Sequence, residues 1–324
     1  MYYYIEMRKL LKSKILWGDK PYQSLNYYLK EQYHEKIYKL SLDGGMTCPN
    51  RDGTIATGGC IFCSEGGSGD FAASRLLSIP EQIEASIQKM HGSTVTKQVG
   101  RKYIAYFQAY TNTYAPIGYL RKIYYEAILH PDIVILSIAT RPDCLSDEVL
   151  SLLEELNKIK PVWIELGLQT IHEDTALFIK RGYPLSCFNE AVDKLHRIGI
   201  DIIVHVILGL PHETNEMILE TINYLNTMPI QGIKLQLLHI LRNTELANLL
   251  EEIPTYSLEE YIALLLTCVE HIREDIVIHR ITGDGPKSLL LAPLWSSNKK
   301  LVLNSIHKAM KENNSWQGKF YKEV

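Results

Sequence analysis

The sequence of 324 residues lacks an apolar run as long as the ~18 residues that a membrane-spanning helix needs. Its first twenty residues mix tyrosines with charged residues, which is not the pattern of a secretory signal peptide. The composition, with 46% hydrophobic and 22% charged residues, is ordinary for a globular protein. We therefore expect a cytoplasmic protein without a membrane partner.

The sequence also lacks internal repeats, low-complexity tracts and a clear interdomain linker. Its formal net charge is only −3, but the charges are unevenly placed. Residues 1–39 carry eight Lys and Arg against four Asp and Glu, residues 295–324 carry six against two, and the middle therefore carries 20 against 31. Basic ends fit contacts with RNA phosphates and fit solvated helix faces equally well, so charge alone does not decide between them.

Cysteines are few, and in a reducing compartment six cysteines do not suggest a disulfide framework. Three of them follow the first apolar run in a C-x11-C-x2-C pattern: Cys48, Cys60 and Cys63. The other three are far apart: Cys144, Cys187 and Cys268. For Cys144 we favour a small buried side chain over a role in trapping a radical or a substrate, and the last two need no function.

The three close cysteines lie in a glycine-rich segment, and glycine lets a backbone curl tightly because it accepts positive φ. Three thiolates can bind three corners of a [4Fe–4S] cube and leave the fourth iron open for chemistry. Zinc is the alternative, because C-x2-C is a common half of a zinc site. The sequence has no second C-x2-C and no H-x3–5-H pair. The spacing therefore favours a cluster, with zinc left as the alternative.

Short apolar, β-prone runs alternate with amphipathic helical stretches at the spacing of βα units. The predicted strands are Ile37–Leu42, Tyr103–Gln108, Ile133–Thr140, Val162–Gln169, Ile200–Leu208 and Ile233–Ile240. The predicted helices are Pro80–Met90, Pro116–Leu129, Ser146–Lys158, Leu185–Ile198, Glu213–Asn226 and Ser257–Arg273. Strands rich in Ile, Val and Leu suit a parallel sheet that is buried on both faces.

Six βα units predict an α/β fold, a partial (β/α)6 TIM-like barrel with a small C-terminal extension. We expect an N-terminal extension at residues 1–36, the barrel at residues 37–240, and a C-terminal extension packed on the barrel at residues 241–324. Chemistry in β/α barrels collects at the carboxyl ends of the strands. The first predicted strand leads directly into the cysteine segment, so we expect the cysteines at this end.

Five segments, together with the three cysteines, resemble a known family: SLDGGMTCPNRDG, YFQAYTNTYAP, IATRPDCL, ELGLQTIHEDT and HVILGLPHET. They resemble the radical S-adenosylmethionine (SAM) superfamily, in the branch near the Elongator catalytic subunit and oxygen-independent coproporphyrinogen oxidase. Within that branch they are similar to the YtqA/YhcC type, also called MnmL-like, over nearly the whole chain. The first cysteine gap is wider than the usual C-x3-C-x2-C, which affects the shape of the loop and not the number of ligands.

The resemblance implies a radical SAM barrel in which Cys48, Cys60 and Cys63 ligate a [4Fe–4S] cluster and SAM closes the fourth iron. One electron then cleaves SAM into methionine and a 5′-deoxyadenosyl radical. The SAM-binding residues that the resemblance implies are Phe62, Gln108, Asn112, Ser137, Arg141, Gln169, Arg181, Gly209 and Leu210. At Gln108 the superfamily often has an acid, so hydrogen bonding would replace charge pairing here. No catalytic side chain is assigned.

Several of these residues also have a purely structural interpretation. Asn112 fits the cap of an ordinary turn. Arg141 and Arg181 can each grip a carboxylate of the ligand, or can pair instead with the neighbouring acids Asp143 and Glu173. Both interpretations stay open at the level of the sequence.

The resemblance further implies a tRNA-modifying enzyme that acts on the wobble uridine. The expected reaction converts 5-carboxymethylaminomethyl-2-thiouridine to 5-aminomethyl-2-thiouridine, with tRNA as substrate and flavodoxin or ferredoxin as electron donor. One alternative is a radical SAM enzyme that acts on a small metabolite. Another, from a different class, is a zinc-dependent RNA-binding module without catalysis. The sequence gives no indication of the oligomeric state.

Overall fold

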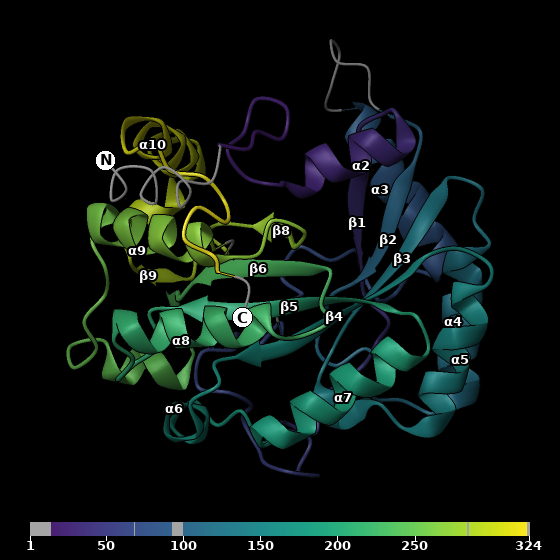
Figure 1. The fold of residues 1–324 in the computed structure, drawn as a ribbon. Helices are drawn as coiled ribbons and strands as arrows, with labels where there is room; N and C mark the ends of the chain where they lie inside the picture. The colour runs from purple at the N-terminus through teal and green to yellow at the C-terminus, as the bar shows by residue number, and fades with distance from the viewer. Residues whose placement is uncertain (1–13, 68, 93–99, 284, 323–324) are drawn as a thin grey trace.

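The computed structural model describes residues 14–67, 69–92, 100–283 and 285–322 (Figure 1). The first thirteen residues of the expected N-terminal extension lie outside the described residues, and so do the last two residues of the basic C-terminal end. No helix among the described residues is long and apolar enough to cross a membrane.

Within the described residues, seven strands form one sheet in the order β1-β2-β3-β4-β5-β6-β8. They are β1 (Tyr38–Leu42), β2 (Tyr103–Phe107), β3 (Ile133–Thr140), β4 (Val162–Gln169), β5 (Asp201–Leu208), β6 (Gly232–Leu237) and β8 (Val277–Arg280). All neighbouring strands pair in parallel. The sheet curls into a half-barrel (Figure 1). A separate antiparallel pair is formed by β7 (Ile240–Leu241) and β9 (Leu290–Ala292).

Helices connect the parallel strands, because each parallel pair needs a crossover. The connecting helices are α3 (Ile79–Gly92), α4 (Ile117–Ile128), α5 (Asp147–Asn157), α6 (Glu173–Phe178), α7 (Leu185–Arg197), α8 (Asn215–Asn226) and α9 (Leu258–His271). Helix α2 (Leu25–Tyr33) precedes β1, and α10 (Lys299–Glu312) follows the last strand. Short 3-10 helices are η1 (Pro142–Cys144), η2 (Glu245–Leu249) and η3 (Leu294–Ser297). At the start of α9, Ser257 and Glu260 form a capping box, which satisfies backbone N–H groups that have no partner within the helix.

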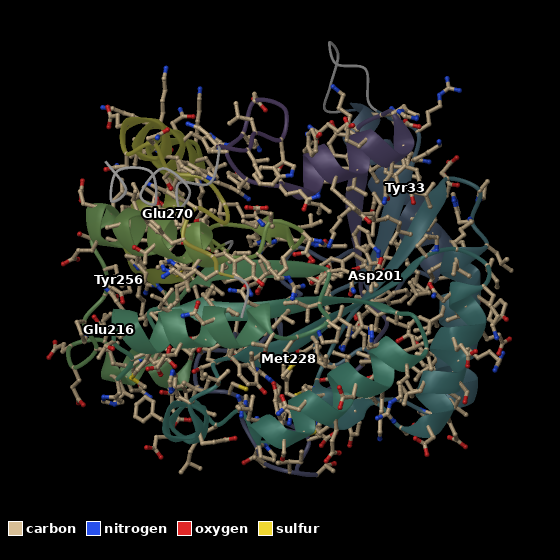
Figure 2. All side chains as sticks on the ribbon, viewed as in Figure 1. Tyr33, Asp201, Glu216, Met228, Tyr256 and Glu270 are labelled. Carbon is tan, nitrogen blue, oxygen red and sulfur yellow. The ribbon has the colours of Figure 1, made fainter. Side chains whose placement is uncertain are left out.

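Apolar side chains fill the space between the sheet and its helices in one large core (Figure 2). Phe107 of β2 meets Tyr124 of α4 edge to face, with ring centroids 5.1 Å apart. The buried Tyr124 hydroxyl donates to the carbonyl oxygen of Asn112, in the loop that follows β2. The core therefore also fixes a loop at the carboxyl end of the sheet.

The predicted α/β half-barrel is confirmed, including all six predicted strands and all six predicted helices, with small shifts at their ends. One such shift is at α8, which begins at Asn215 because the Thr214 hydroxyl accepts from the N–H of Met217 as its cap. The count of six strands is wrong by one. Strand β8 pairs with β6 and extends the sheet into the stretch that we expected to be an extension. With only four residues and the sequence VIHR, it is too short and too polar to be predicted.

Candidate active site

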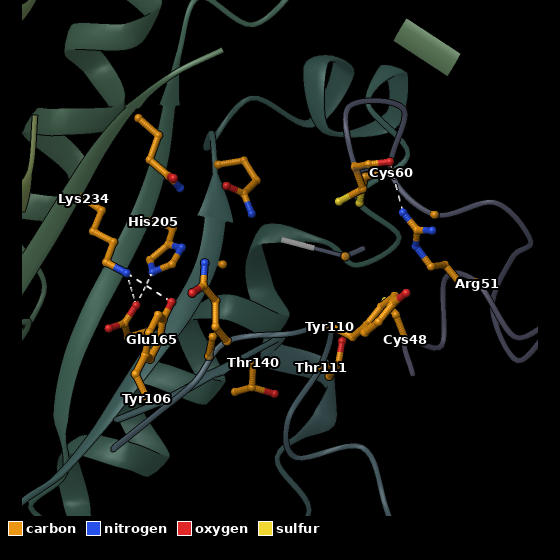
Figure 3. A pocket seen from close by; sticks show the side chains of 18 of the residues that line it. Cys48, Arg51, Cys60, Tyr106, Tyr110, Thr111, Thr140, Glu165, His205 and Lys234 are labelled. Carbon is orange, nitrogen blue, oxygen red and sulfur yellow. Dashed lines mark hydrogen bonds and ion pairs between the residues drawn. The ribbon is translucent and has the colours of Figure 1, made fainter. Parts of the chain in front are cut away.

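A pocket opens where the carboxyl ends of the strands meet the cysteine loop, which we define as residues 43–78 (Figure 3). From this loop the pocket is lined by Cys48, Arg51, Gly59, Cys60, Cys63 and Gly67. From the strands and the segments that follow them it is lined by Tyr106, Gln108, Tyr110, Thr111, Ala139, Thr140, Glu165, Gly167, Gln169, His205, Lys234, Gln236 and Arg280. The pocket thus joins sulfur donors on one side to charged side chains of the barrel interior on the other.

A buried asparagine anchors the cysteine loop to the barrel. Asn50 donates from Nδ2 to the carbonyl oxygen of Lys180 at 2.6 Å. The same nitrogen lies 3.6 Å from Sγ of Cys60, within reach of a hydrogen bond to sulfur. Hydrogen bonds to sulfur stabilise the thiolate form that binds metal. Asn50 therefore positions the loop and supplies a donor to one of its thiols.

Arg51 fixes the backbone of the cysteine loop around Cys63. Arg51 donates to the carbonyl oxygens of Cys63 at 3.1 Å and Ser64 at 2.6 Å. The backbone of Gly59 passes so close that a Cβ there would lie 2.8 Å from Nε of Arg51, and Gly59 has φ +89°. Only glycine combines this close approach with a left-handed backbone. The segment that contains Cys60 and Cys63 therefore packs closely against the guanidinium of Arg51, which hydrogen bonds hold in place.

The thiols of this loop interact with one another. The pKa of Cys60 is lowered to about 7, because the Cys63 thiol donates to its sulfur and because Arg141 lies nearby. The pKa of Cys63 is raised well above its usual value by the same hydrogen bond and by burial, with Cys48 adding to the effect. Among the described residues, no three His, Cys, Asp or Glu side chains meet closely enough to hold a single metal ion. A [4Fe–4S] cube binds each thiolate at a separate iron, so three soft donors along one wall fit it.

Two of the predicted SAM-binding residues line the pocket together with the cysteines: Gln108 and Gln169. Gln169 is the last residue of β4 and has φ +69°, a left-handed conformation that is uncommon for a residue with a side chain. The register between β4 and β5 shifts beside it. This irregularity lies at the pocket, where backbone strain often accompanies function.

Phe62 lines a second pocket, which shares Cys63, Gln108, Gln236 and Arg280 with the first and also contains Ile207 and His239. Gly209 and Leu210 follow β5, outside the lining of both pockets. Gly209 has φ +88°, and a Cβ there would lie 2.9 Å from the ring of Tyr256. Of these three predicted residues, only Phe62 therefore lines a pocket next to the cysteines.

Both predicted arginines have partners within the protein. Arg141 forms a fork with Asp143, with N···O distances of 2.9 and 2.7 Å. Arg181 is buried and donates to the carbonyl oxygens of Leu168, Thr170 and Tyr183, and to the Glu173 carboxylate. Neither arginine lines the pocket. Asp143 contacts Arg141 and Glu173 contacts Arg181, as the structural interpretation of the sequence proposed.

Asn112 and Ser137 are also buried and hydrogen-bonded inside the protein. Asn112 donates from Nδ2 to the carbonyl oxygens of Phe107 and Ala139, which fastens the end of β2 to β3. Ser137 donates to Oε1 of Glu165 at 2.9 Å. Ser137 therefore contacts the pocket through Glu165.

Glu165 is the centre of a charge cluster that the sequence did not predict. Its side chain is fully buried and contacts the ammonium groups of Lys39 and Lys234. Its Oε2 also lies 2.9 Å from Nε2 of His205. The Lys234 ammonium lies 3.2 Å from the hydroxyl of Tyr106 (Figure 3). Side chains from β1, β2, β4, β5 and β6 thus meet inside the barrel.

Burial and the neighbouring charges shift the pKa values of the side chains in this cluster. Although burial opposes it, Lys234 and Lys39 hold the pKa of Glu165 well below its usual value. Burial, together with Lys39 and Arg280, lowers the pKa of Lys234 to about 7 against the pull of Glu165. Burial and Lys234 lower the pKa of His205 to about 4, so this imidazole is neutral at pH 7. The carboxylate is therefore ionised and faces more than one cation.

A signal for the cluster exists in the sequence, although it is weak. Lys39 interrupts the apolar run YKLSL, and Lys234 interrupts GIKLQL. A lysine on a strand that is buried on both faces must find a partner, because burying an unpaired charge is very costly. The partner itself lies on β4, more than sixty residues away, and only the fold reveals it.

Comparisons with known proteins agree with the fold and give the family. A sequence profile described as "Radical SAM superfamily" matches residues 51–225, and one described as "Radical_SAM C-terminal domain" matches residues 230–312. Uncharacterized protein YtqA of Bacillus subtilis is 45% identical over 308 residues, which cover 94% of each chain. Protein YhcC of Escherichia coli is 37% identical over 274 residues, 84% of this chain and 86% of that protein.

Two archaeal proteins are more distantly similar. The tRNA uridine(34) acetyltransferase of Methanocaldococcus infernus is 25% identical over 170 residues, 51% of this chain and 31% of that protein. A solved structure of Methanocaldococcus infernus Elp3 lacking residues 1–46 superposes with a TM-score of 0.66 at 16% identity. The superposition covers 87% of this chain and 64% of that chain. At this level of identity the likeness concerns the fold.

Proposed function

This chain belongs to the radical SAM superfamily, and on that premise we propose that it is an enzyme that modifies the wobble uridine of tRNA. The proposed reaction converts 5-carboxymethylaminomethyl-2-thiouridine to 5-aminomethyl-2-thiouridine. The observation that carries this proposal is the match of half of the chain to a protein named for tRNA uridine 34, which is the wobble position. The proposal places the enzyme in the cytoplasm, with flavodoxin or ferredoxin as electron donor.

In this proposal Cys48, Cys60 and Cys63 hold a [4Fe–4S] cluster, and SAM binds beside it. When bound, the cluster and SAM supply a 5′-deoxyadenosyl radical, which can remove a hydrogen atom from carbon. The chain itself binds and orients the reactants, as proteins do for cofactors that carry the difficult chemistry. Gln108 and Gln169 line the pocket and offer amide groups to the polar parts of SAM.

The second pocket supports the predicted role of Phe62. It is adjacent to the main pocket and offers an aromatic ring and the aliphatic side chain of Ile207. Flat heteroaromatic rings bind well between such side chains. We propose that the adenine of SAM occupies this second pocket, next to Gln236 and Arg280, which line both pockets.

The proposed reaction balances without an additional oxidant. Hydrogen is removed from the methylene between the amine and the carboxylate, where the adjacent nitrogen stabilises a carbon radical. Overall the bond between the nitrogen and this methylene breaks, water supplies an oxygen, and the two-carbon fragment leaves as an aldehyde acid. The two electrons released reduce the carbon–sulfur bond of SAM, which gives methionine and 5′-deoxyadenosine.

Mass spectrometry of wobble nucleosides tests the proposal in cells. In a strain without this gene, the carboxymethylaminomethyl nucleoside should accumulate and the aminomethyl nucleoside and its derivatives should be lost. The wild-type gene should reverse this change. A Cys63→Ala gene should not reverse it, whereas Cys187→Ala should, because Cys187 starts α7 and does not line the pocket. Wobble nucleosides that are the same with and without the gene would refute the tRNA substrate.

Anaerobic reconstitution distinguishes the proposed function from the two alternative functions that the sequence allows. The proposal expects iron and sulfide on the purified protein and cleavage of SAM under reductant. Cleavage of SAM combined with unchanged wobble nucleosides would point to a small metabolite as substrate. A colourless protein with stoichiometric zinc and no cleavage of SAM would instead indicate a zinc-dependent RNA-binding module.

A further inference from the structure

The two basic ends of the sequence come together in the fold. The N–H of Gln23 donates to Oε1 of Gln317 at 2.9 Å. The Tyr22 hydroxyl lies 3.3 Å from Nε2 of His307 on α10, and the two rings stack. Figure 1 shows the segment of residues 14–24 beside α10. Residues that are almost 300 positions apart in the sequence therefore share one surface.

We call the surface formed by residues 14–24 and 300–314 the basic face. It carries five lysines against two acids, Asp19 and Glu312. The lysines are Lys14, Lys20, Lys300, Lys308 and Lys311. Glu312 is paired with Lys308 at 3.8 Å. The basic face therefore keeps a net positive charge.

Three of these lysines lie on the same side of the molecule. Lys300 and Lys311 are exposed, and the eleven residues between them make about three turns of α10, so both point to the same side of the helix. Lys20 lies near the middle of this helix, because burial and Lys20 together lower the pKa of His307, against a smaller effect of Asp19. The positive charges are thus close enough to act on one ligand.

A cavity of about 280 Å³ lies between residues 20–26, β8 and the start of α10. The first residues of two helices line it, Leu25 of α2 and Lys299 of α10. Helix N-termini carry partial positive charge and attract anions. Lys20 also lines the cavity, whereas no Asp or Glu is among the described residues that do so. The cavity therefore suits a negatively charged group.

A buried hydroxyl in this cavity has no partner. Thr282 lines the cavity two residues after the end of β8 and is only 3% exposed. Its Oγ1 forms no hydrogen bond with any described residue. An unpaired buried hydroxyl is unfavourable, and an oxygen of a bound anion would satisfy it. This observation points to a ligand independently of the helix ends and the lysines.

The basic face adjoins the proposed active site. Arg280 lines this cavity, the main pocket and the second pocket. Between the two ends, the chain carries 20 Lys and Arg against 31 Asp and Glu. A polyanion is therefore attracted to the basic face and repelled by the acidic remainder of the protein. An RNA whose phosphates lie on this face is next to the main pocket.

We propose that the basic face binds backbone phosphates of the tRNA and that the cavity holds one of them. This inference rests on the proposed function, which supplies tRNA as the substrate. Phosphate contacts fix the position and orientation of a nucleic acid without reading its sequence. The basic face thus positions the tRNA, and the main pocket acts on the wobble uridine.

The salt dependence of tRNA binding tests the basic face. The dissociation constant is measured anaerobically on the reconstituted enzyme, with tRNA that carries 5-carboxymethylaminomethyl-2-thiouridine, between about 50 and 200 mM potassium chloride. The triple variant Lys20→Gln, Lys300→Gln and Lys311→Gln should weaken binding about tenfold or more at the lower salt concentration. It should also reduce the slope of log affinity against log salt by about two to three, because each lost phosphate contact releases nearly one counter-ion less.

The matched control removes three lysines from other surfaces. Lys122, Lys158 and Lys194 are exposed on α4, at the end of α5 and on α7, and Figure 1 shows these helices on the other side of the molecule from α10. Their combined replacement by glutamine changes the net charge equally and should keep the affinity and the slope of the wild type. Iron content and urea unfolding of both triple variants should match the wild type, which excludes misfolding as the cause.

Thr282→Val tests the cavity separately. Valine has the shape of threonine and lacks the unpaired hydroxyl, so the variant should be at least as stable as the wild type in urea. Its affinity for tRNA should fall about two- to tenfold, the value of one hydrogen bond, while the salt slope stays unchanged. An unchanged affinity would show that no phosphate occupies the cavity.

Other results overturn the inference in distinct ways. If the wild type binds and converts tRNA while the basic-face variant keeps its affinity and slope, the proposed function stands and the basic face is refuted. Equal losses in the control variant would show an effect of net charge alone, which also refutes it. A wild type that binds phosphatidylglycerol vesicles and no tRNA assigns the face to a lipid surface. A wild type that neither binds nor converts tRNA refutes the proposed function together with the inference.

Discussion

Replacement of Glu165 by glutamine tests how the barrel interior holds its charges. The carboxylate is fully buried and contacts Lys39, Lys234 and His205. Glutamine keeps the shape and loses the negative charge. Lys234 then remains buried at 5% side-chain exposure, while Lys39 at 20% can still reach water. The variant therefore leaves the buried amine of Lys234 without its carboxylate partner, which favours its charged form.

The size of the effect follows from the cost of such a charge. Removing one partner of a buried ion pair typically lowers the free energy of unfolding by about 3–5 kcal/mol. For 324 residues with an unfolding entropy of about 2.1 cal/mol/K per residue, this corresponds to a decrease in Tm of about 4–7 °C. An exposed pair gives the matched control: Glu155→Gln breaks the contact with Arg121, at 43% and 47% side-chain exposure, and should cost less than about 1 kcal/mol.

Urea unfolding of the metal-free protein, followed by circular dichroism, measures these differences. A double-mutant cycle adds the decisive comparison. Combining Glu165→Gln with Lys234→Met removes both charges, so the double variant should be more stable than the sum of the single effects predicts, by about 1–3 kcal/mol. If Glu165→Gln costs no more than the surface control, or if the two changes are simply additive, the buried ion cluster does not exist in solution.

Three further outcomes are expected. Cys63→Ala should abolish the iron content and visible absorbance that reconstitution gives to the wild type, whereas Cys187→Ala should retain both. Gly209→Ala should lower the free energy of unfolding in urea by about 1–3 kcal/mol, because φ is +88° and the new Cβ would lie 2.9 Å from the ring of Tyr256. The control is Gly118→Ala in α4, where a Cβ meets open space, and this variant should be neutral or stabilising. The folded pKa of Lys234, about 7, lies below its unfolded value of 10.5, so the unfolded chain binds more protons between these values. The wild type should therefore gain stability relative to Lys234→Met as pH rises from 7 to 10, and an equal pH profile for the two would contradict this.

The fold was predictable because its strands are buried on both faces. The residues of β3 and β5 are almost continuously apolar, and such runs can be recognised without knowledge of the tertiary structure. Strand β8 could not be recognised in this way. Its two apolar residues are followed by His279 and Arg280, and its place in the sheet depends on pairing with β6. Strands this short are defined by their neighbours.

The site was predictable where the signal is local. Cys48, Cys60 and Cys63 lie within sixteen residues, and the structure brings all three to one pocket. The charge cluster around Glu165 was not predictable, because a lysine in a sequence looks the same whether its partner is water or a carboxylate on another strand. The partners of Arg181 could not be predicted either, because its guanidinium donates to backbone carbonyl oxygens, which leave no pattern in the sequence.

Stability does not explain why this barrel contains a buried ion cluster. Well-packed apolar side chains of similar volume usually stabilise a protein as much as a buried ion pair, or more, because charges lose their hydration. An interior with Lys39, Glu165, Lys234 and Arg280 is therefore a costly way to fill space. Glu165, His205 and Lys234 of this cluster line the pocket, on the opposite side from Cys60. The cost to the fold is thus best understood as preorganisation of polar groups for a ligand.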